Sequence, residues 1–100
     1  MSKKKDQPFL MGIGVYRREQ WPLLRALAVD SQDLEPQYDL WLKALTEFKL
    51  QLESMGHAST EVDIDVNELL AWCEAQNRPL DAQARTEFIE IKVRNMQGVE

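Results

Sequence analysis

The stretch LEPQYDLWLKALTEFKLQLESM, residues 34–55, predicts one long amphipathic helix around which the rest of the chain is organised. Its apolar residues recur at alternating spacings of four and three, which places them on one helical face. These residues are Leu34, Tyr38, Trp41, Leu45, Phe48, Leu52 and Met55. We expect this face to pack into the core of the domain. Leu40 and Leu50 lie off the apolar face, and we expect them to mark where a second chain touches.

Both ends of this helix carry boundary signals. Asp33 is a candidate N-cap, which places Pro36 in the first turn, where the missing N–H of proline leaves no bond unmade. Gly56 suits the left-handed conformation that ends many helices. The predicted helix therefore runs from residue 34 to residue 55.

The segment before this helix predicts a strand and a short helix. Apolar residues alternate along residues 9–16, which is typical of a strand with one continuous apolar face. The other face carries Gly12 and Gly14, whose bare backbone would either let a helix approach closely or mark a bulge. A short helix over about residues 19–29 follows, with Pro22 in its first turn.

The segment after the long helix changes period. Alternation of apolar and acidic residues predicts a strand over residues 59–64. Asp65 then caps a third helix that ends near Asn77. Asp81 caps a last helix over about residues 82–96.

This order of elements, strand-helix-helix-strand-helix-helix, predicts an α+β fold that is rich in helix. We expect a basic, disordered tail over residues 1–7 and a single globular domain over residues 8–98, with a small two-stranded sheet packed on four helices. Two strands alone are marginally stable and leave exposed edges. We therefore hypothesise that two chains pair strands across a two-fold axis to form a homodimer.

Composition excludes several classes of protein. One hundred residues with 44% hydrophobic content suffice for one core. A net charge of −5 opposes binding to a phosphate backbone, so nucleic acid is not expected as a partner. The single cysteine allows no intramolecular disulfide, which suits a cytoplasmic protein. No run approaches the roughly 18 apolar residues that a membrane span needs, so no membrane partner is expected.

Two motifs resemble cofactor sites without completing them. Gly12 and Gly14 match the start of a dinucleotide-binding loop, but Arg17 stands where the third glycine belongs. A calcium-loop spacing begins at Asp63, but Glu68 stands where the loop needs its glycine. We therefore expect no cofactor.

Acidic residues in and after the second strand are the candidate metal ligands. Glu61, Asp63 and Asp65 share one face of an extended segment, where carboxylates can bind a metal or divide acid and base roles. An acidic face also keeps a strand edge soluble without any chemistry. His57 and Cys73 are too few for a zinc site, and a Cys–His nucleophilic pair is the other role open to them. Cys73 lies on an apolar helical stripe, where a buried thiol is ordinary.

Four short motifs resemble those of a family of small bacterial proteins of unknown function. The resemblance covers roughly residues 13–90 and implies a bacterial, cytoplasmic, stand-alone domain, with no catalytic signature to carry over. The motifs are Ile13-Gly14-Val15-Tyr16, Gln20-Trp21-Pro22-Leu23-Leu24, Tyr38-Asp39-Leu40-Trp41-Leu42 and Ile64-Asp65-Val66-Asn67-Glu68-Leu69-Leu70-Ala71-Trp72-Cys73.

Two functional hypotheses follow from these patterns. The leading one is a noncatalytic interaction or regulatory protein, for which Leu40, Leu50 and Trp72 are the interface candidates. The alternative is a small metal-dependent hydrolase that uses the acidic residues at positions 61, 63 and 65. The identity of any protein partner is not predicted.

Overall fold

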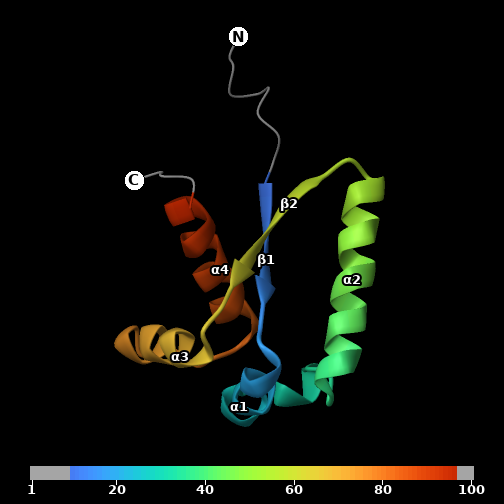
Figure 1. Cartoon of the computed structure of the whole chain (residues 1–100). Helices are drawn as coiled ribbons and strands as arrows, with labels where there is room; N and C mark the ends of the chain where they lie inside the picture. The colour runs from blue at the N-terminus through green and yellow to red at the C-terminus, as the bar shows by residue number, and fades with distance from the viewer. Residues whose placement is uncertain (1–9, 97–100) are drawn as a thin grey trace.

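A computed structural model describes residues 10–96 and shows an α+β fold, as predicted (Figure 1). The tail predicted at residues 1–7 and the predicted end of the domain at residue 98 lie outside the described residues. In chain order the elements are β1 (Leu10–Val15), η2 (Arg18–Gln20), α1 (Trp21–Leu27), η3 (Ser31–Asp33), α2 (Tyr38–Ser54), β2 (Ala58–Asp63), α3 (Val66–Ala75) and α4 (Ala82–Met96). The two η elements are single 3₁₀ turns.

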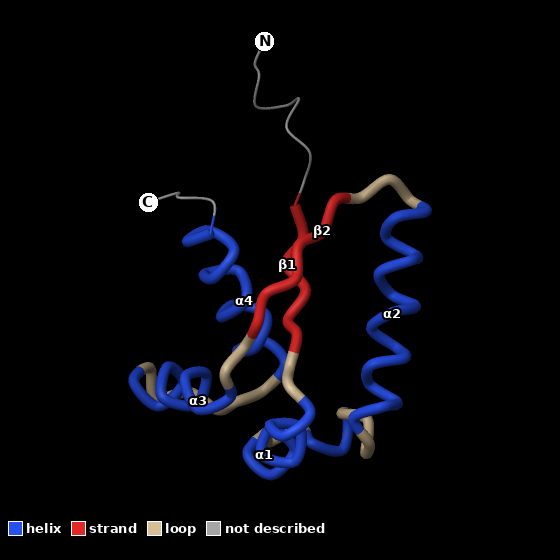
Figure 2. The backbone as a smooth tube through the Cα atoms, in the orientation of Figure 1, coloured by secondary structure: helices blue, strands red, loops and turns tan. Residues whose placement is uncertain are grey.

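The two strands are parallel, a direction that the sequence pattern left open. Their register runs from Leu10 opposite Ala58 to Val15 opposite Asp63. Parallel strands need a crossover connection, and here α1 and α2 supply it. Figure 2 shows the strand pair between α2 on one side and α4 on the other.

Helix α4 lies directly on the glycine face of β1, which confirms the predicted close approach. A Cβ added at Gly12 would lie 2.4 Å from Val93 Cγ2, and one added at Gly14 would lie 2.6 Å from Ile89 Cδ1. Real Cβ contacts are not this short, so a side chain at Gly12 would force its neighbours on α4 to shift, whereas one at Gly14 would meet the movable end of Ile89. Two bare positions in β1 thus set how closely α4 packs on the sheet.

The main core lies between the sheet and the helices α1, α3 and α4. Its buried residues are Tyr16, Trp21, Leu24, Ala28, Val62, Ile64, Val66, Leu69, Cys73, Leu80, Ala84, Phe88 and Val93. Part of α2 is held against this core by four aromatic rings, Tyr16, Trp21, Tyr38 and Trp41, whose paired centroids lie 5.1–6.1 Å apart. The Tyr38 hydroxyl also donates a hydrogen bond of 2.7 Å to the Tyr16 carbonyl.

Helix α2 begins later than predicted, at Tyr38, with Gln37 as its N-cap residue. The predicted start after Asp33 is wrong because Asp33 closes a 3₁₀ turn and Leu34 is extended. A residue that precedes proline avoids the helical region, and Glu35 precedes Pro36. The Glu35 carbonyl instead accepts a hydrogen bond of 3.1 Å from the Trp21 indole N–H.

The apolar face of α2 is only partly buried, which corrects the prediction that all of it belongs to the core. Tyr38 and Trp41 pack against the main core, and Leu52 is 4% exposed. Phe48 and Met55, on the same predicted stripe, are 42% and 59% exposed. Helix α2 stands beside the sheet (Figure 1), and part of its apolar face stays exposed.

The remaining boundaries match the sequence patterns closely. Helix α4 spans the predicted residues, and its first turn is capped by Asp81, whose Oδ1 accepts from the Ala84 amide at 2.9 Å. Gly56 adopts a φ of +79° after α2, as its predicted role in ending the helix requires. Pro22 lies in the first turn of α1. Within residues 10–96, no helix is both long and apolar enough to cross a membrane.

Candidate functional site

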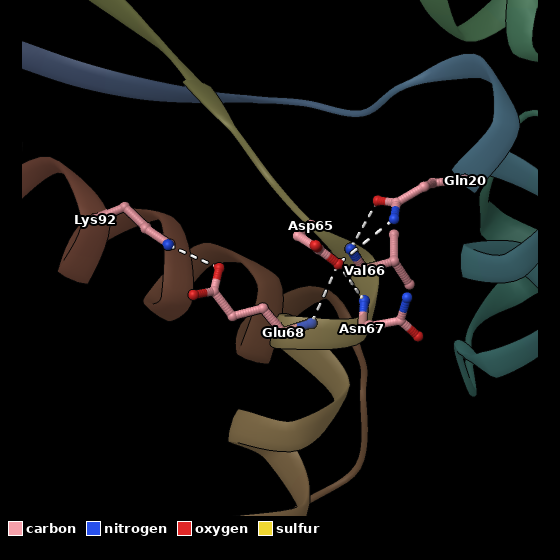
Figure 3. Close-up of polar contacts among 6 residues, drawn as sticks. All are labelled: Gln20, Asp65, Val66, Asn67, Glu68 and Lys92. Atoms are coloured by element: carbon pink, nitrogen blue, oxygen red, sulfur yellow. Dashed lines mark hydrogen bonds and ion pairs between the residues drawn. The ribbon is translucent and has the colours of Figure 1, made fainter.

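The three predicted acidic residues make different contacts. Glu61 of β2 forms an ion pair with Lys49 of α2, and Asp63 lies exposed at the end of the strand. Asp65 caps α3, where its Oδ1 accepts hydrogen bonds from the Asn67 amide at 2.8 Å and the Glu68 amide at 3.4 Å (Figure 3). The three carboxylates therefore do not converge on one point.

Hydrogen bonds to the charged form keep the pKa of Asp65 below its usual value. The bond from the Asn67 amide contributes most, followed by the bond from the Gln20 side chain and the bond from the Glu68 amide. A carboxylate held in this way stabilises the start of a helix. Its bonding is that of a structural cap.

Gln20 completes this capping arrangement, and sequence reasoning missed it. Its Oε1 accepts from the Val66 amide at 2.8 Å, while its Nε2 donates to Asp65 Oδ1 at 3.4 Å (Figure 3). Gln20 lies at the end of η2, so it ties the entrance of α1 to the start of α3. No short-range pattern signals a contact between residues 45 positions apart.

The later residues of the predicted calcium-loop spacing belong to helix α3. Asn67 lies in its first turn and Glu74 near its end, so both belong to a helix and not to a loop. Glu68 pairs with Lys92 of α4 at 2.8 Å (Figure 3). Among residues 10–96, no group of three or more His, Cys, Asp or Glu side chains is arranged to hold a metal ion.

Cys73 and His57 lie in different environments. Cys73 is 1% exposed in the main core, and burial raises the pKa of its thiol. Its place on the buried side of α3 is the one that the apolar stripe predicted. His57 is exposed in the connection between α2 and β2. A buried, protonated thiol is a poor nucleophile, so this pair offers no catalytic centre.

The three interface candidates differ in exposure. Leu40 and Leu50 on α2 are 43% and 60% exposed. Trp72 is half-buried. Its ring centroid lies 5.4 Å from the ring centroid of Phe88 and 5.3 Å from the guanidinium carbon of Arg78. Trp72 is therefore engaged within its own chain, whereas the two leucines present apolar surface.

An apolar groove of about 510 Å³ lies between β1, α2 and α4. Its lining comprises Leu10, Met11, Gly12, Phe48, Thr86, Ile89, Glu90, Val93 and Arg94. Side chains alternate between the two faces of a strand, so a groove that touches three consecutive β1 residues runs along the strand edge. Phe48 forms one wall and α4 the other. Sequence reasoning missed this groove because it placed Phe48 in the core and because the walls come from distant segments.

No protein-family model, curated protein or solved structure matches this chain. The resemblance of residues 13–90 to small bacterial proteins stays a prediction. The candidate site is accordingly defined by geometry alone, and its two surfaces are the exposed face of α2 and the groove along β1.

Proposed function

We propose that this protein is a noncatalytic interaction module of the cytoplasm that presents helix α2 to a protein partner. The observation that carries the proposal is the concentration of exposed apolar side chains on this one element. Within residues 10–96, seven large hydrophobic side chains are exposed, and five of them lie on α2 or at its C-cap: Leu40, Leu42, Phe48, Leu50 and Met55. Isolated exposed leucines are common, but five exposed apolar side chains spread around one helix show that the fold leaves much of α2 uncovered.

The outer face of α2 carries Leu40 and Leu50 among charged residues. At 100° per residue, these two leucines lie well away from the stripe that Trp41 and Leu52 direct inward. Apolar side chains with a polar surround are the usual anatomy of a transient protein interface. The outer face therefore suits an amphipathic partner that docks against a helix.

Site-specific photocrosslinking tests this proposal. A photoreactive phenylalanine at position 50 should crosslink one discrete protein in a lysate of the native host, and Leu40→Glu in the same chain should abolish that product. The matched control carries the photoreactive residue at position 74, which is also exposed but lies on α3. Equal products from positions 50 and 74, or a product that survives Leu40→Glu, would contradict the proposal.

Thermal shift measurements distinguish the interaction module from the alternative, a metal-dependent hydrolase. Mg²⁺, Ca²⁺ or Mn²⁺ should leave the melting temperature unchanged if the acidic residues only solvate and cap. Asp63→Asn is the appropriate comparison, because Asp63 is exposed and does not cap α3. A metal-induced rise in melting temperature that disappears in this variant would favour the hydrolase.

A further inference from the structure

We infer that the groove along β1 is a homodimer interface, in which the β1 strands of two copies pair antiparallel across a two-fold axis and form one continuous sheet. This inference rests on the proposed interaction function and makes a second copy of the chain the occupant of the groove. It concerns the groove face of the molecule, whereas the heterologous surface proposed above is the outer face of α2.

The free edge of β1 offers unpaired backbone groups to a partner. The Val15 carbonyl accepts a hydrogen bond of 3.0 Å from the Ile64 amide, just beyond the end of β2. Successive residues of a strand direct their N–H and C=O groups to opposite edges, so Leu10, Gly12 and Gly14 point away from β2. Within residues 10–96, β1 has β2 as its one strand neighbour. No turn or loop backbone group in this range bonds to the three residues.

The two strands differ in how well their edges resist pairing. Natural edge strands are commonly blocked by charged residues, proline or bulges. Strand β2, ASTEVD, carries Glu61 and Asp63, whereas β1, LMGIGV, has no charge and no proline. The uncharged edge is also the one that borders the apolar groove. Of the two edges, β1 is therefore the one suited to a second strand.

A two-fold axis through Gly12 gives a consistent register. It pairs Gly12 with Gly12 of the second copy, and Leu10 with Gly14 of the second copy. All three residues direct their backbone groups to this edge, so each pair is a hydrogen-bonded one and about six inter-strand bonds result. The sheet then has four strands, which removes the marginal stability of an isolated strand pair.

The same axis brings the two α4 helices into packing distance. An axis perpendicular to the sheet places both copies of α4 on one face. Neighbouring strands lie about 4.8 Å apart, so helices that each rest over both strands of their own chain come about 10 Å apart, the spacing at which helices pack. Thr86, Glu90 and Arg94, at successive turns of α4, line the groove and face the second copy.

Charge on α4 is self-complementary about this axis. Glu90 and Arg94 are exposed, and neither takes part in an ion pair within the described part of the chain. Ile89 and Val93 both lie over Gly12, so the level of the axis along α4 falls between these two residues. Two antiparallel helices related by such an axis place Glu90 of one copy within about a turn of Arg94 of the other. Two Glu90–Arg94 pairs therefore flank the axis, and the two Glu90 side chains face one another across it.

Phe48 of α2 belongs to the same interface, on the face of the sheet opposite α4. It is 42% exposed and lines the groove from α2. When two grooves meet edge to edge, each Phe48 covers apolar surface of the other copy. The exposure of Phe48, which the fold of a single chain does not explain, is then that of an interface residue.

The first experiment measures mass by sedimentation equilibrium over a range of concentrations. The full chain should show twice the mass of one chain. Phe48→Glu should weaken dimerisation at least tenfold, whereas Leu50→Glu, on the outer face of the same helix, should leave it unchanged. Circular dichroism establishes that both variants are folded. A full chain that stays monomeric into the high-micromolar range overturns the inference, and so does equal behaviour of the two folded variants.

The second experiment tests the geometry by exchanging charges. Glu90→Arg and Arg94→Glu should each weaken dimerisation, because each homodimer then places like charges opposite one another. An equimolar mixture of the two single variants should recover dimers, since every Arg then faces a Glu. Single variants that dimerise like the parent chain would overturn the proposed axis, and so would a mixture of the two that stays monomeric.

Amide exchange supplies a readout at the strand itself. Gly12 and Gly14 amides should become protected as protein concentration rises, while the Ile13 amide, which faces β2, should be protected throughout. Protection of Gly12 and Gly14 that is independent of concentration would contradict strand pairing between copies. Loss of the dimer with retention of the position-50 crosslink would reject this inference and leave the interaction function standing. The reverse result would reject only the heterologous surface.

Discussion

At the scale of single residues, Gly12 and Gly14 fix the distance between β1 and α4. Alanine at Gly12 would press on the Cγ2 methyl groups of Val93 and Ile89, whose β-branched side chains have little χ1 freedom in a helix, whereas alanine at Gly14 would meet the movable end of Ile89. We predict that Gly12→Ala lowers the free energy of unfolding by about 2 kcal/mol and that Gly14→Ala costs less than about 1 kcal/mol. Urea unfolding of the two variants measures both values. Equal costs would show that α4 shifts as a rigid unit.

Tyr16 provides a residue-scale test of burial. Burial raises the pKa of its phenol to about 12, against a smaller lowering by the Arg85 charge. The folded-state pKa lies above the unfolded value, so the folded state favours the neutral phenol. The stabilisation from this preference is complete below about pH 10 and is lost as the pH rises through 12. Tyr16→Phe should remove this alkaline loss of stability, as followed by near-ultraviolet absorbance and circular dichroism during a pH titration. An unchanged titration would place Tyr16 at the surface.

At the scale of elements, α2 divides into an anchored part and an uncovered part. Trp41 packs in the aromatic cluster, and we predict that Trp41→Ala lowers the free energy of unfolding by about 3 kcal/mol at every protein concentration. Phe48 is half in solvent, so the cost of Phe48→Ala should instead grow with protein concentration, as expected for a residue that stabilises only the dimer. Thermal unfolding at several concentrations separates the two cases.

The same division shows what the sequence could predict about the elements. Periodicity and capping located four of the elements. Alternating apolar residues predicted β1 and β2, and the caps Asp65 and Asp81 marked the starts of α3 and α4. The start of α2 was misplaced because two local rules conflict there. A candidate cap at Asp33 favoured a helix, while proline after Glu35 opposed one, and the contact from the Trp21 indole to the Glu35 carbonyl favours the later start.

The candidate site was less predictable than the fold. The sequence predicted Leu40 and Leu50 as residues off the main stripe, and both are exposed. It did not predict the groove, whose walls are brought together only by the parallel pairing of β1 with β2 and by the packing of α4 on Gly12. Periodicity says which face of a helix is apolar, but not how much of that face the rest of the chain covers. That difference decides between core and interface at Phe48.

At the scale of the whole molecule, one ion pair joins the first half of the chain to the last helix. Arg85 of α4 donates two hydrogen bonds of 2.9 Å to the two carboxylate oxygens of Asp30, which follows α1. The side chains are 12% and 18% exposed, so this pair is better shielded than the Arg18–Asp39 pair, whose side chains are 64% and 72% exposed. The hydrogen bonds from Arg85 hold the pKa of Asp30 below its usual value.

This pair should make stability fall in acid. A depressed folded-state pKa contributes stability that is complete above the unfolded pKa of about 3.9 and is lost as the pH falls through the folded pKa. We predict that Asp30→Asn lowers the free energy of unfolding by about 2 kcal/mol at neutral pH, because it leaves Arg85 shielded and without its charge partner. The difference from the parent chain should shrink as the pH falls below 4. Urea unfolding at neutral and acid pH measures it, with Asp39→Asn as the matched exposed control. A similar loss in both variants would show that shielding contributes nothing, and a pH-independent difference would show that Asp30 acts through packing instead of charge.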